Sequence, residues 1–339
     1  MTITEIAKKA GVSSMTVSNV INGHTKRVSL KTSNKVKRIM EENNYVPNLS
    51  ARSLRASSNI IAVFVPLVKS QTHNNIFLDP YLSQMIGIFE ENLRQKGFFA
   101  MIRSVESIND INLMIQNWNV DGAILVYPYF ENQIDLLLEK NKIPLVFLDS
   151  FKNNPRALTV NIRDAKGTYL ATKRLIELGH TKIAFVGNYE GNTLVTSRFN
   201  GYHQAMEEAH LTIEKDFIYT VDSIFSEGKK VGKDIVLNKK FTAAVTTADI
   251  SAAGIIEGVR SAGYSVPEDL SVTGYDDTSI ATLVYPKLTT VNQHIEQKAT
   301  SAVNLLLDKL KGKTGDNNHI LLDVELIERD STAKPRQDT

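Results

Sequence analysis

The sequence has no cysteine, a single tryptophan and no long apolar run. Without cysteine, the chain has no disulfide, no thiolate zinc site and no cysteine nucleophile. Its longest apolar stretch, residues 60–68, is far shorter than the roughly 20 residues that a membrane-spanning helix requires. Residues 1–10 also lack the apolar region of a secretory signal. We therefore expect a cytoplasmic protein with no membrane partner.

Signals of catalysis are missing as well. The sequence contains neither a phosphate-binding glycine loop nor a nucleophile elbow, and His203 and His210 lack the spacing of a metal pair. Gly179 is expected to end a helix, and His180 to bond the carbonyls that this helix end leaves free. We expect no enzymatic activity, no cofactor and no metal.

The charge of the chain is unevenly distributed. With 339 residues, of which 42% are apolar, the chain is large enough for two or three domains. Residues 1–58 hold ten Lys and Arg against three Glu, a net charge of +7, whereas the remainder is mildly acidic. A small basic segment ahead of an acidic body is typical of proteins that bind a polyanion, although a merely solvated basic surface has the same charge.

The basic segment predicts three short helices. Thr2 and Glu5 fit a capping box, and apolar residues follow at helical spacing. Gly11 ends this helix, and Ser13 caps a second helix that runs to about residue 22. Ser29 caps a third helix, with cationic side chains facing outward. The pattern is a helix, a tight turn and a helix, although a generic helical bundle has similar spacing.

The second helix is expected to present a small polar face. Val17, Val20 and Ile21 share the opposite, apolar face. The polar face suits the major groove, because Asn pairs with adenine, Ser bonds either base type and Met contacts a thymine methyl. Asn19 is the best candidate for reading a base. The other residues of this face are Ser14, Met15, Ser18 and residue 22.

The order of motifs in this segment resembles the lactose/galactose repressor (LacI/GalR) family. The resemblance rests on TITEIAKKAGVSSMTVSNVING at residues 2–23, Val28-Ser29, Tyr45-Val46-Pro47-Asn48 and Ala51-Arg52-Ser53-Leu54-Arg55. It implies a helix-turn-helix domain over residues 1–46 and a hinge helix and linker over residues 47–58, with Leu54 as a wedge in the minor groove. The implied DNA contacts are Thr2, Ser14, Met15, Thr16, Ser18, Asn19, Ser29, Asn48, Ala51, Leu54 and Arg55.

From residue 59 onward, apolar runs rich in β-formers alternate with helical stretches. This rhythm predicts βαβ units, parallel sheets buried on both faces, and two lobes. Ligands of such folds bind at the carboxyl ends of the strands. The expected strands lie near residues 60–66, 98–102, 122–127, 144–148, 182–187, 216–221, 242–247 and 270–274.

The family resemblance continues through this core. It rests on Val120-Asp121-Gly122, residues 175–187, Arg198, residues 264–277 and Leu288-Thr289-Thr290-Val291. The implied fold is an N-terminal all-α helix-turn-helix domain plus hinge helix, followed by an α/β two-lobed periplasmic-binding-protein-like core with parallel sheets. The implied lobes are residues 59–161 with 291–319, and residues 162–290 with 320–331, followed by a disordered tail at 332–339.

The resemblance also implies a small-molecule effector between the lobes. Carboxylates and Arg bind hydroxyls and an aromatic ring covers an apolar sugar face, so we expect a carbohydrate effector. Each residue also has a purely structural interpretation, such as a helix cap, a turn brace or a core side chain. The implied effector contacts are Tyr81, Asp149, Arg198, Phe225, Asp249, Asp276 and Gln293.

Several positions depart from the family pattern. Asn19 stands where many relatives have Arg, residues 69–81 differ from the usual run, and Ala248 replaces a frequent Asn. Arg163-Asp164 stands where relatives often have Asp-Asn. The extra cation raises a sugar phosphate as a second effector class, but a surface salt bridge is the favoured interpretation of Arg163. The tail lacks the leucine heptads of a coiled-coil tetramer.

Together these features predict a transcriptional regulator, a repressor, that binds a pseudo-palindromic operator as a homodimer and responds to a small effector. Two alternatives use the same core. A solute-binding protein without gene regulation would have a signal peptide and no basic head, and an enzyme with a DNA-binding appendage would need a catalytic constellation in the core. Residues 1–58 weigh against the first, and the absence of catalytic motifs weighs against the second.

Overall fold

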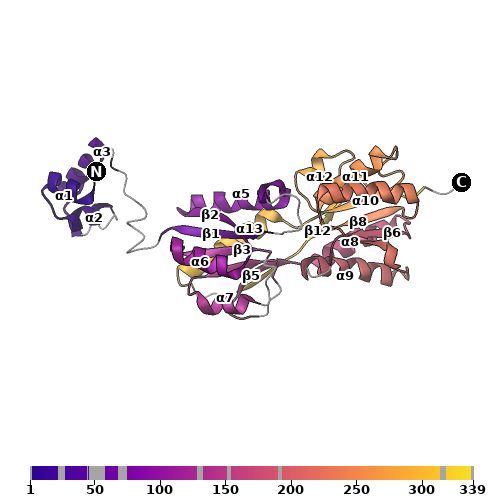
Figure 1. Ribbon diagram of the computed structural model, residues 1–339, viewed down its shortest axis with the longest axis horizontal. Coiled ribbons are helices and arrows are strands. Elements are labelled where there is room, and N and C mark those ends of the chain that lie inside the picture. Colours follow the sequence, from indigo (N-terminus) through magenta and orange to yellow (C-terminus); the bar gives the residue numbers. More distant parts are fainter. Residues whose placement is uncertain are drawn as a thin grey trace. The chain divides into compact units, whose positions relative to one another are not determined.

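The structure is a computed structural model that describes residues 2–21, 27–43, 45, 58–67, 75–127, 133–150, 154–189, 193–313 and 318–336. The chain divides into two compact units, residues 1–58 and 59–339 (Figure 1). Within the described residues, no helix is long and apolar enough to cross a membrane.

The first unit contains the three predicted helices, α1 (Ile3–Ala10), α2 (Ser14–Ile21) and α3 (Leu30–Glu42). The capping box at Thr2 and the left-handed Gly11 (φ 66°) are both present, as predicted. Ser29 caps α3 by accepting a hydrogen bond from the Thr32 amide. Val17, Val20 and Val36 are buried with Ile6 of α1, so the apolar faces of all three helices meet in one core.

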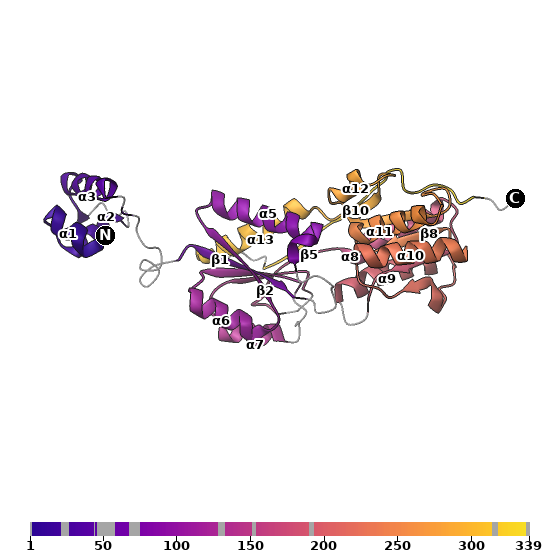
Figure 2. The same cartoon turned by 45° about the horizontal axis from the view of Figure 1, so that its top comes forward.

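The second unit contains two six-stranded sheets, one in each lobe (Figure 2). The first sheet is parallel throughout, with strand order β11-β5-β4-β3-β1-β2. Its strands are β1 (Ile60–Pro66), β2 (Phe99–Val105), β3 (Gly122–Val126), β4 (Leu145–Leu148), β5 (Leu158–Ile162) and β11 (His319–Leu322).

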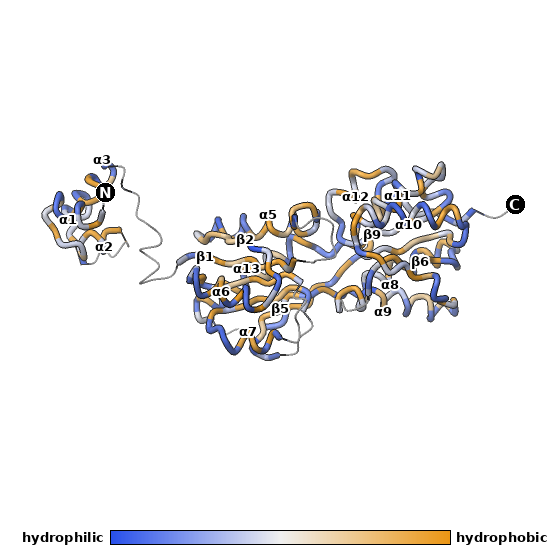
Figure 3. The backbone as a smooth tube through the Cα atoms, viewed as in Figure 1, coloured by the Kyte–Doolittle hydropathy of each residue, from blue (hydrophilic) through white to orange (hydrophobic). Residues whose placement is uncertain are grey.

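Helices cover both faces of the first sheet. Residues 61, 63 and 65 of β1 face α5 (Pro80–Gln95) and α13 (Ile295–Leu310), and residues 62 and 64 face α6 (Ile108–Trp118) and α7 (Ile134–Lys140). This burial on two faces explains why the central strands β1, β3 and β4 are continuous apolar runs. Figure 3 shows such apolar segments along the central strands. A short 3-10 helix, η2 (Ile76–Leu78), precedes α5.

The second sheet has strand order β12-β10-β9-β8-β6-β7, and only β12 pairs antiparallel. Its strands are β6 (Ile183–Val186), β7 (Ile218–Tyr219), β8 (Ala243–Thr246), β9 (Ser271–Asp276), β10 (Thr289–Asn292) and β12 (Glu325–Ile327). The helices of this lobe are α8 (Asp164–Glu177), α9 (Thr193–Glu208), η4 (Lys215–Phe217), α10 (Phe225–Asn238), α11 (Asp249–Ser261) and α12 (Ile280–Leu283).

The chain passes between the lobes three times, and two of these crossings differ from the prediction. The first crossing lies between β5 and α8, close to residue 161. The second follows Asn292, because the whole of β10 pairs in the second sheet and the return to the first lobe therefore does not begin at 291. The third follows Leu322 rather than residue 319, because β11 pairs with β5 in the first sheet.

The predicted disorder of residues 332–339 is wrong as far as residue 336. The Ala333 carbonyl accepts hydrogen bonds from Nε2 of His180 (2.8 Å) and Oγ of Ser271 (3.2 Å), and Arg336 pairs with Asp269. These polar contacts order the tail without the apolar pattern that sequence analysis detects. His180 has a structural role, as predicted: its amide donates to the Leu175 carbonyl of the preceding helix (3.1 Å), and its ring bonds Ala333 and Thr242.

Candidate functional site

The exposed face of α2 carries the predicted base readers. Ser14 is exposed and Met15 retains 62% of its accessible surface, whereas Val17 and Val20 are buried beneath them. Ser18 and Asn19 are half-buried along the same face. The helix therefore presents short polar side chains and one thioether, a surface able to enter a major groove and contact base edges.

Three of the predicted DNA contacts also serve as helix caps or cap partners. The Thr2 amide donates to Oε2 of Glu5 (2.7 Å), and the Glu5 amide donates to Oγ1 of Thr2. Ser29 caps α3, and the Thr16 amide donates to Oγ of Ser13 (3.1 Å). Thr2 and Ser29 consequently lie at helix N-termini, where backbone amides favour phosphate oxygens.

Cationic side chains surround these helices. Lys8, Lys31, Lys35 and Lys37 are exposed. Arg38 is also exposed, and it forms an ion pair with Glu42 at 2.7 Å. The predicted hinge contacts Asn48, Ala51, Leu54 and Arg55 lie outside the described residues.

A buried group of polar residues lies where the two lobes meet. We call it the interlobe cluster, and its members are Tyr81, Asp149, Asp164, Arg198, Tyr275, Asp276, Gln293 and Lys298. All eight are buried, and they come from α5, α8, α9, β9, α13, the end of β4 and the second crossing. The cluster brings together five of the seven predicted effector contacts.

Lys298 holds the first-lobe end of the cluster. Its ammonium donates to Oδ1 of Asp149 (2.5 Å), to the Tyr81 hydroxyl (3.0 Å) and to Oε1 of Gln293 (3.0 Å). The Tyr81 ring also stacks on Tyr127, with 5.6 Å between ring centroids. Asp149 adopts φ 57°, a left-handed conformation that is uncommon outside glycine and occurs at functional sites.

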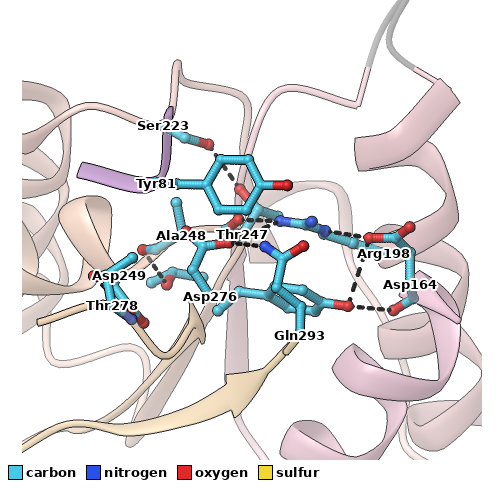
Figure 4. Close-up of polar contacts among 12 residues, drawn as sticks. Tyr81, Asp164, Arg198, Ser223, Thr247, Ala248, Asp249, Asp276, Thr278 and Gln293 are labelled. Carbon is cyan, nitrogen blue, oxygen red and sulfur yellow. Dashed lines mark hydrogen bonds and ion pairs between the residues drawn. The ribbon is translucent and has the colours of Figure 1, made fainter. Parts of the chain in front are cut away.

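Arg198 organises the second-lobe end (Figure 4). Its Nε donates to Oδ1 of Asp164 (2.8 Å) and its Nη1 to the Thr247 carbonyl (2.6 Å), while the guanidinium lies 3.7 Å from the centre of the Tyr275 ring. Burial disfavours the charged guanidinium, but the nearby carboxylates, Asp164 foremost, more than compensate and raise the pKa of Arg198. The side chain is therefore a permanent cation.

Gln293 and Asp276 join the two ends. The Gln293 amide nitrogen donates to Oδ1 of Asp276 (2.6 Å), and that oxygen lies 3.9 Å from Nη1 of Arg198. Asp276 ends β9 with φ 121°, a strained backbone that directs its carboxylate toward the crossing. A chain of polar contacts thus runs from Lys298 in the first lobe to Arg198 in the second.

Several polar atoms of the cluster have no hydrogen-bond partner among the described residues. They are Oδ2 of Asp149, Oδ2 of Asp164 and Nη2 of Arg198, all buried. An unsatisfied buried polar atom costs about 1–3 kcal/mol, so such atoms normally have a partner. These two acceptors and one donor could therefore bind a ligand that carries both hydrogen-bond donors and acceptors.

A pocket of about 520 Å³ adjoins the cluster, and its lining includes Asp276, Asp277, Asn292 and His294. This volume is in the range of small-molecule sites. Among the described residues, no group of His, Asp and Glu side chains has an arrangement that could hold a metal ion.

Asp249 lies beside the cluster but serves the second lobe. Its carboxylate accepts from the Thr278 amide (2.7 Å), the Thr278 hydroxyl (3.1 Å) and the Thr290 hydroxyl (2.5 Å). Burial raises the pKa of Asp249 to about 7, against the opposing effect of these hydrogen bonds. Both carboxylate oxygens of Asp249 already accept hydrogen bonds within the second lobe, which favours a structural role over contact with an effector. Phe225, at the start of α10, is 41% exposed and is not in the cluster.

Comparison with known proteins decides the family. Residues 2–48 match the model of bacterial regulatory proteins of the lacI family, and residues 172–332 match a periplasmic binding protein-like domain. The HTH-type transcriptional repressor PurR of Aliivibrio salmonicida is 32% identical, over 98% of this chain and 99% of that protein. The chain belongs to the lacI family.

Solved structures agree with this assignment. The Lac repressor dimer bound to operator and the anti-inducer ONPF is 26% identical and has a TM-score of 0.84, with 98% of this chain and 99% of that chain covered. A complex of the transcriptional regulator CelR with cellobiose is also 26% identical over the same shares, with a TM-score of 0.71. This lacI-family protein is a DNA-binding transcriptional repressor.

Sequence reasoning missed Lys298 and did not assign Asp164 to the site. Lys298 left a detectable signal, because it lies in the apolar stripe of α13 formed by Ile295, Ala299, Ala302 and residue 306. Asp164 was noted only for its neighbour Arg163, whose side chain is exposed. The cation that pairs with Asp164 is Arg198, from the adjacent helix.

Proposed function

We propose that this lacI-family repressor binds a pseudo-palindromic operator as a homodimer. In each subunit α2 enters the major groove of one half-site, with Asn19, Met15 and Ser14 contacting bases. The pair of hinge segments occupies the central minor groove, with Leu54 as the wedge. The exposed polar face of α2 above a buried apolar face supports this role for the helix.

Exposed apolar side chains support the dimer. Leu283 ends α12 with 80% of its surface accessible, and Tyr285 follows with 85%. Adjacent exposed apolar side chains can form an interaction patch, and aromatic residues are enriched at protein interfaces. The related Lac repressor was solved as a dimer on its operator, and a symmetric dimer matches the symmetry of a palindrome.

We propose further that the effector is a neutral carbohydrate bound by the interlobe cluster. The observation that carries this proposal is the set of buried, unpartnered atoms on Asp149, Asp164 and Arg198. A sugar presents hydroxyls that donate to the carboxylates and accept from the guanidinium. Both cations of the cluster already have a carboxylate partner, Arg198 with Asp164 and Lys298 with Asp149, so neither is left unpaired for a sugar phosphate. Its residues bind and orient, and none forms a nucleophile–base pair.

A ligand screen by thermal unfolding tests the effector class. The full-length protein is heated with a panel of neutral sugars and the corresponding sugar phosphates. A neutral sugar at 100 times its Kd adds about 2.7 kcal/mol to the free energy of unfolding, which raises Tm by a few degrees. Stabilisation by sugar phosphates alone would contradict the neutral effector, and the variant Arg198→Met should lose the response to any neutral sugar that binds.

A further inference from the structure

Lys298 is fully buried and all of its hydrogen-bonding capacity is used. An ammonium has three N–H donors, and the three here go to Asp149, Tyr81 and Gln293. No donor is left for a ligand. Its function must therefore act through the residues that it holds.

The three acceptors belong to separate parts of the chain. Asp149 follows β4 and Tyr81 lies in the first turn of α5, both in the first lobe. Gln293 lies in the crossing between β10 of the second sheet and α13 of the first lobe. One cation thus connects the carboxyl end of a strand, the start of a helix and the segment that joins the lobes.

The Gln293 amide has a charged partner at each end. The Gln293 Oε1 accepts from Lys298 at 3.0 Å, and the amide nitrogen consequently faces away from the cation. That nitrogen donates to Oδ1 of Asp276 at 2.6 Å, in the second lobe. Lys298 on the oxygen and Asp276 on the nitrogen favour the same orientation, so the amide bridges a cation of the first lobe and a carboxylate of the second.

We propose that Lys298 is a positioning residue of the effector site. By holding the oxygen of the Gln293 amide whose nitrogen bonds Asp276, it ties the first lobe to the second and fixes the spacing between them. A buried ion pair by itself is weak evidence for stability, because desolvation offsets much of the attraction. A positioning role explains why the third N–H of Lys298 bonds Gln293, which lies in the segment that crosses between the lobes.

The absence of cysteine makes the lobe spacing directly measurable. Gln116→Cys in α6 and Lys233→Cys in α10 place one exposed label in each lobe of the full-length protein. Electron-spin distance measurements then report the spacing within one chain when labelled protein is diluted in an excess of unlabelled protein. Circular dichroism and thermal unfolding establish that each variant is folded.

The link between the lobes runs from Lys298 through Gln293 to Asp276, and two variants interrupt it at different points. Lys298→Met combined with Asp149→Asn removes the cation without leaving a bare buried carboxylate, and Gln293→Leu removes the contact with Asp276 while Lys298 keeps Asp149. The matched control is Lys313→Met with Asp308→Asn, which removes an exposed ion pair near the end of α13. The parent should give one narrow distance distribution, and the control should reproduce it.

We expect both interlobe variants to broaden or shift the distribution by similar amounts. Their combination should change it no further, because both act on one tie. An unchanged distribution in the folded Lys298 variant, with a broadened one in Gln293→Leu, would show that Lys298 does not position Gln293. Two unchanged distributions would show that the tie does not set the spacing.

The inference concerns the proposed effector site, but its readout requires neither effector nor DNA. Failure of the sugar screen would leave the distance result standing, and failure of the distance test would leave the sugar screen standing. The two proposals can therefore be overturned separately.

Discussion

In the first unit, the residues proposed to read DNA lie on the exposed face of one helix, close together in the sequence. In the second unit, the residues of the interlobe cluster are buried and come from helices and strands far apart in the sequence. The difference has an energetic consequence. Truncating an exposed reader removes only its contact with DNA, whereas truncating a buried charge also leaves its partners unpaired.

The strongest effect that we expect comes from Arg198→Met. The change leaves Asp164 and Asp276 buried without their cation, and breaking such a pair costs about 3–5 kcal/mol. Denaturant unfolding of the core measures this loss. Arg94→Met is the control, because its exposed pair with Glu90 contributes at most about 0.5 kcal/mol. Equal losses in the two variants would mean that the cluster is solvated.

Asp249→Asn should flatten the pH dependence of stability. Between about pH 4 and 7, the folded protein keeps a proton on Asp249 that the unfolded chain has released, so rising pH favours unfolding. The contribution is present in full below pH 4 and is lost as the pH rises through about 7. In the parent this ionisation lowers the free energy of unfolding by on the order of 2–4 kcal/mol, and the Asn variant, which does not titrate, lacks that decrease. Urea unfolding between pH 4 and 8 measures it.

A control of opposite sign is available for that prediction. The hydrogen bond from Lys166 lowers the pKa of the exposed Asp323, so the contribution of Asp323 is lost as the pH falls. Asp323→Asn should therefore remove this small contribution near neutral pH and change little in acid, where the parent has already lost it. A pH profile of Asp249→Asn parallel to that of the parent would contradict the raised pKa.

Asn19→Ala should weaken operator binding without changing the stability of the first unit. Loss of a bidentate contact to a base costs about 1–3 kcal/mol and relaxes specificity at one base pair in each half-site. Operators selected from a random library by the parent and by the variant show at which base pair the sequence preference relaxes. A uniform loss at all positions would assign Asn19 to a phosphate contact.

The smallest effect that we expect comes from Thr2→Ala. The substitution removes the side-chain cap of α1 and should cost about 1 kcal/mol in the stability of the first unit. Thermal unfolding of the full chain, followed by a probe placed in α1, measures this loss. If operator affinity fell by more than the loss of stability explains, Thr2 would contact DNA directly.

Local patterns predicted the first unit well. Caps, a left-handed glycine and an apolar stripe depend on residues within four positions of each other, and these signals located α1, α2 and α3. The same reasoning found eight of the twelve strands in the described part of the core. It missed β5, β10, β11 and β12 because polar residues interrupt their apolar runs, and their pairing depends on distant strands.

The candidate site was only partly predictable. The resemblance identified Tyr81, Asp149, Arg198, Asp276 and Gln293, which the structure brings together. Asp249 accepts hydrogen bonds from Thr278 and Thr290 of its own lobe. The spacing of residues in the sequence does not reveal this role. Lys298 interrupts an apolar stripe, but its partner Asp149 is 149 residues away in the chain. Pairings at that distance follow from topology rather than from local sequence.

The most direct test of the account is a titration of operator binding with neutral sugars, in the parent and in folded Arg198→Met. We expect at least one sugar to change the operator affinity of the parent by roughly 5- to 150-fold. The variant should bind the operator within about twofold of the parent affinity and show no response to the sugar, because the reading residues and the cluster belong to different units. A variant that responds like the parent would contradict the assignment of the effector site.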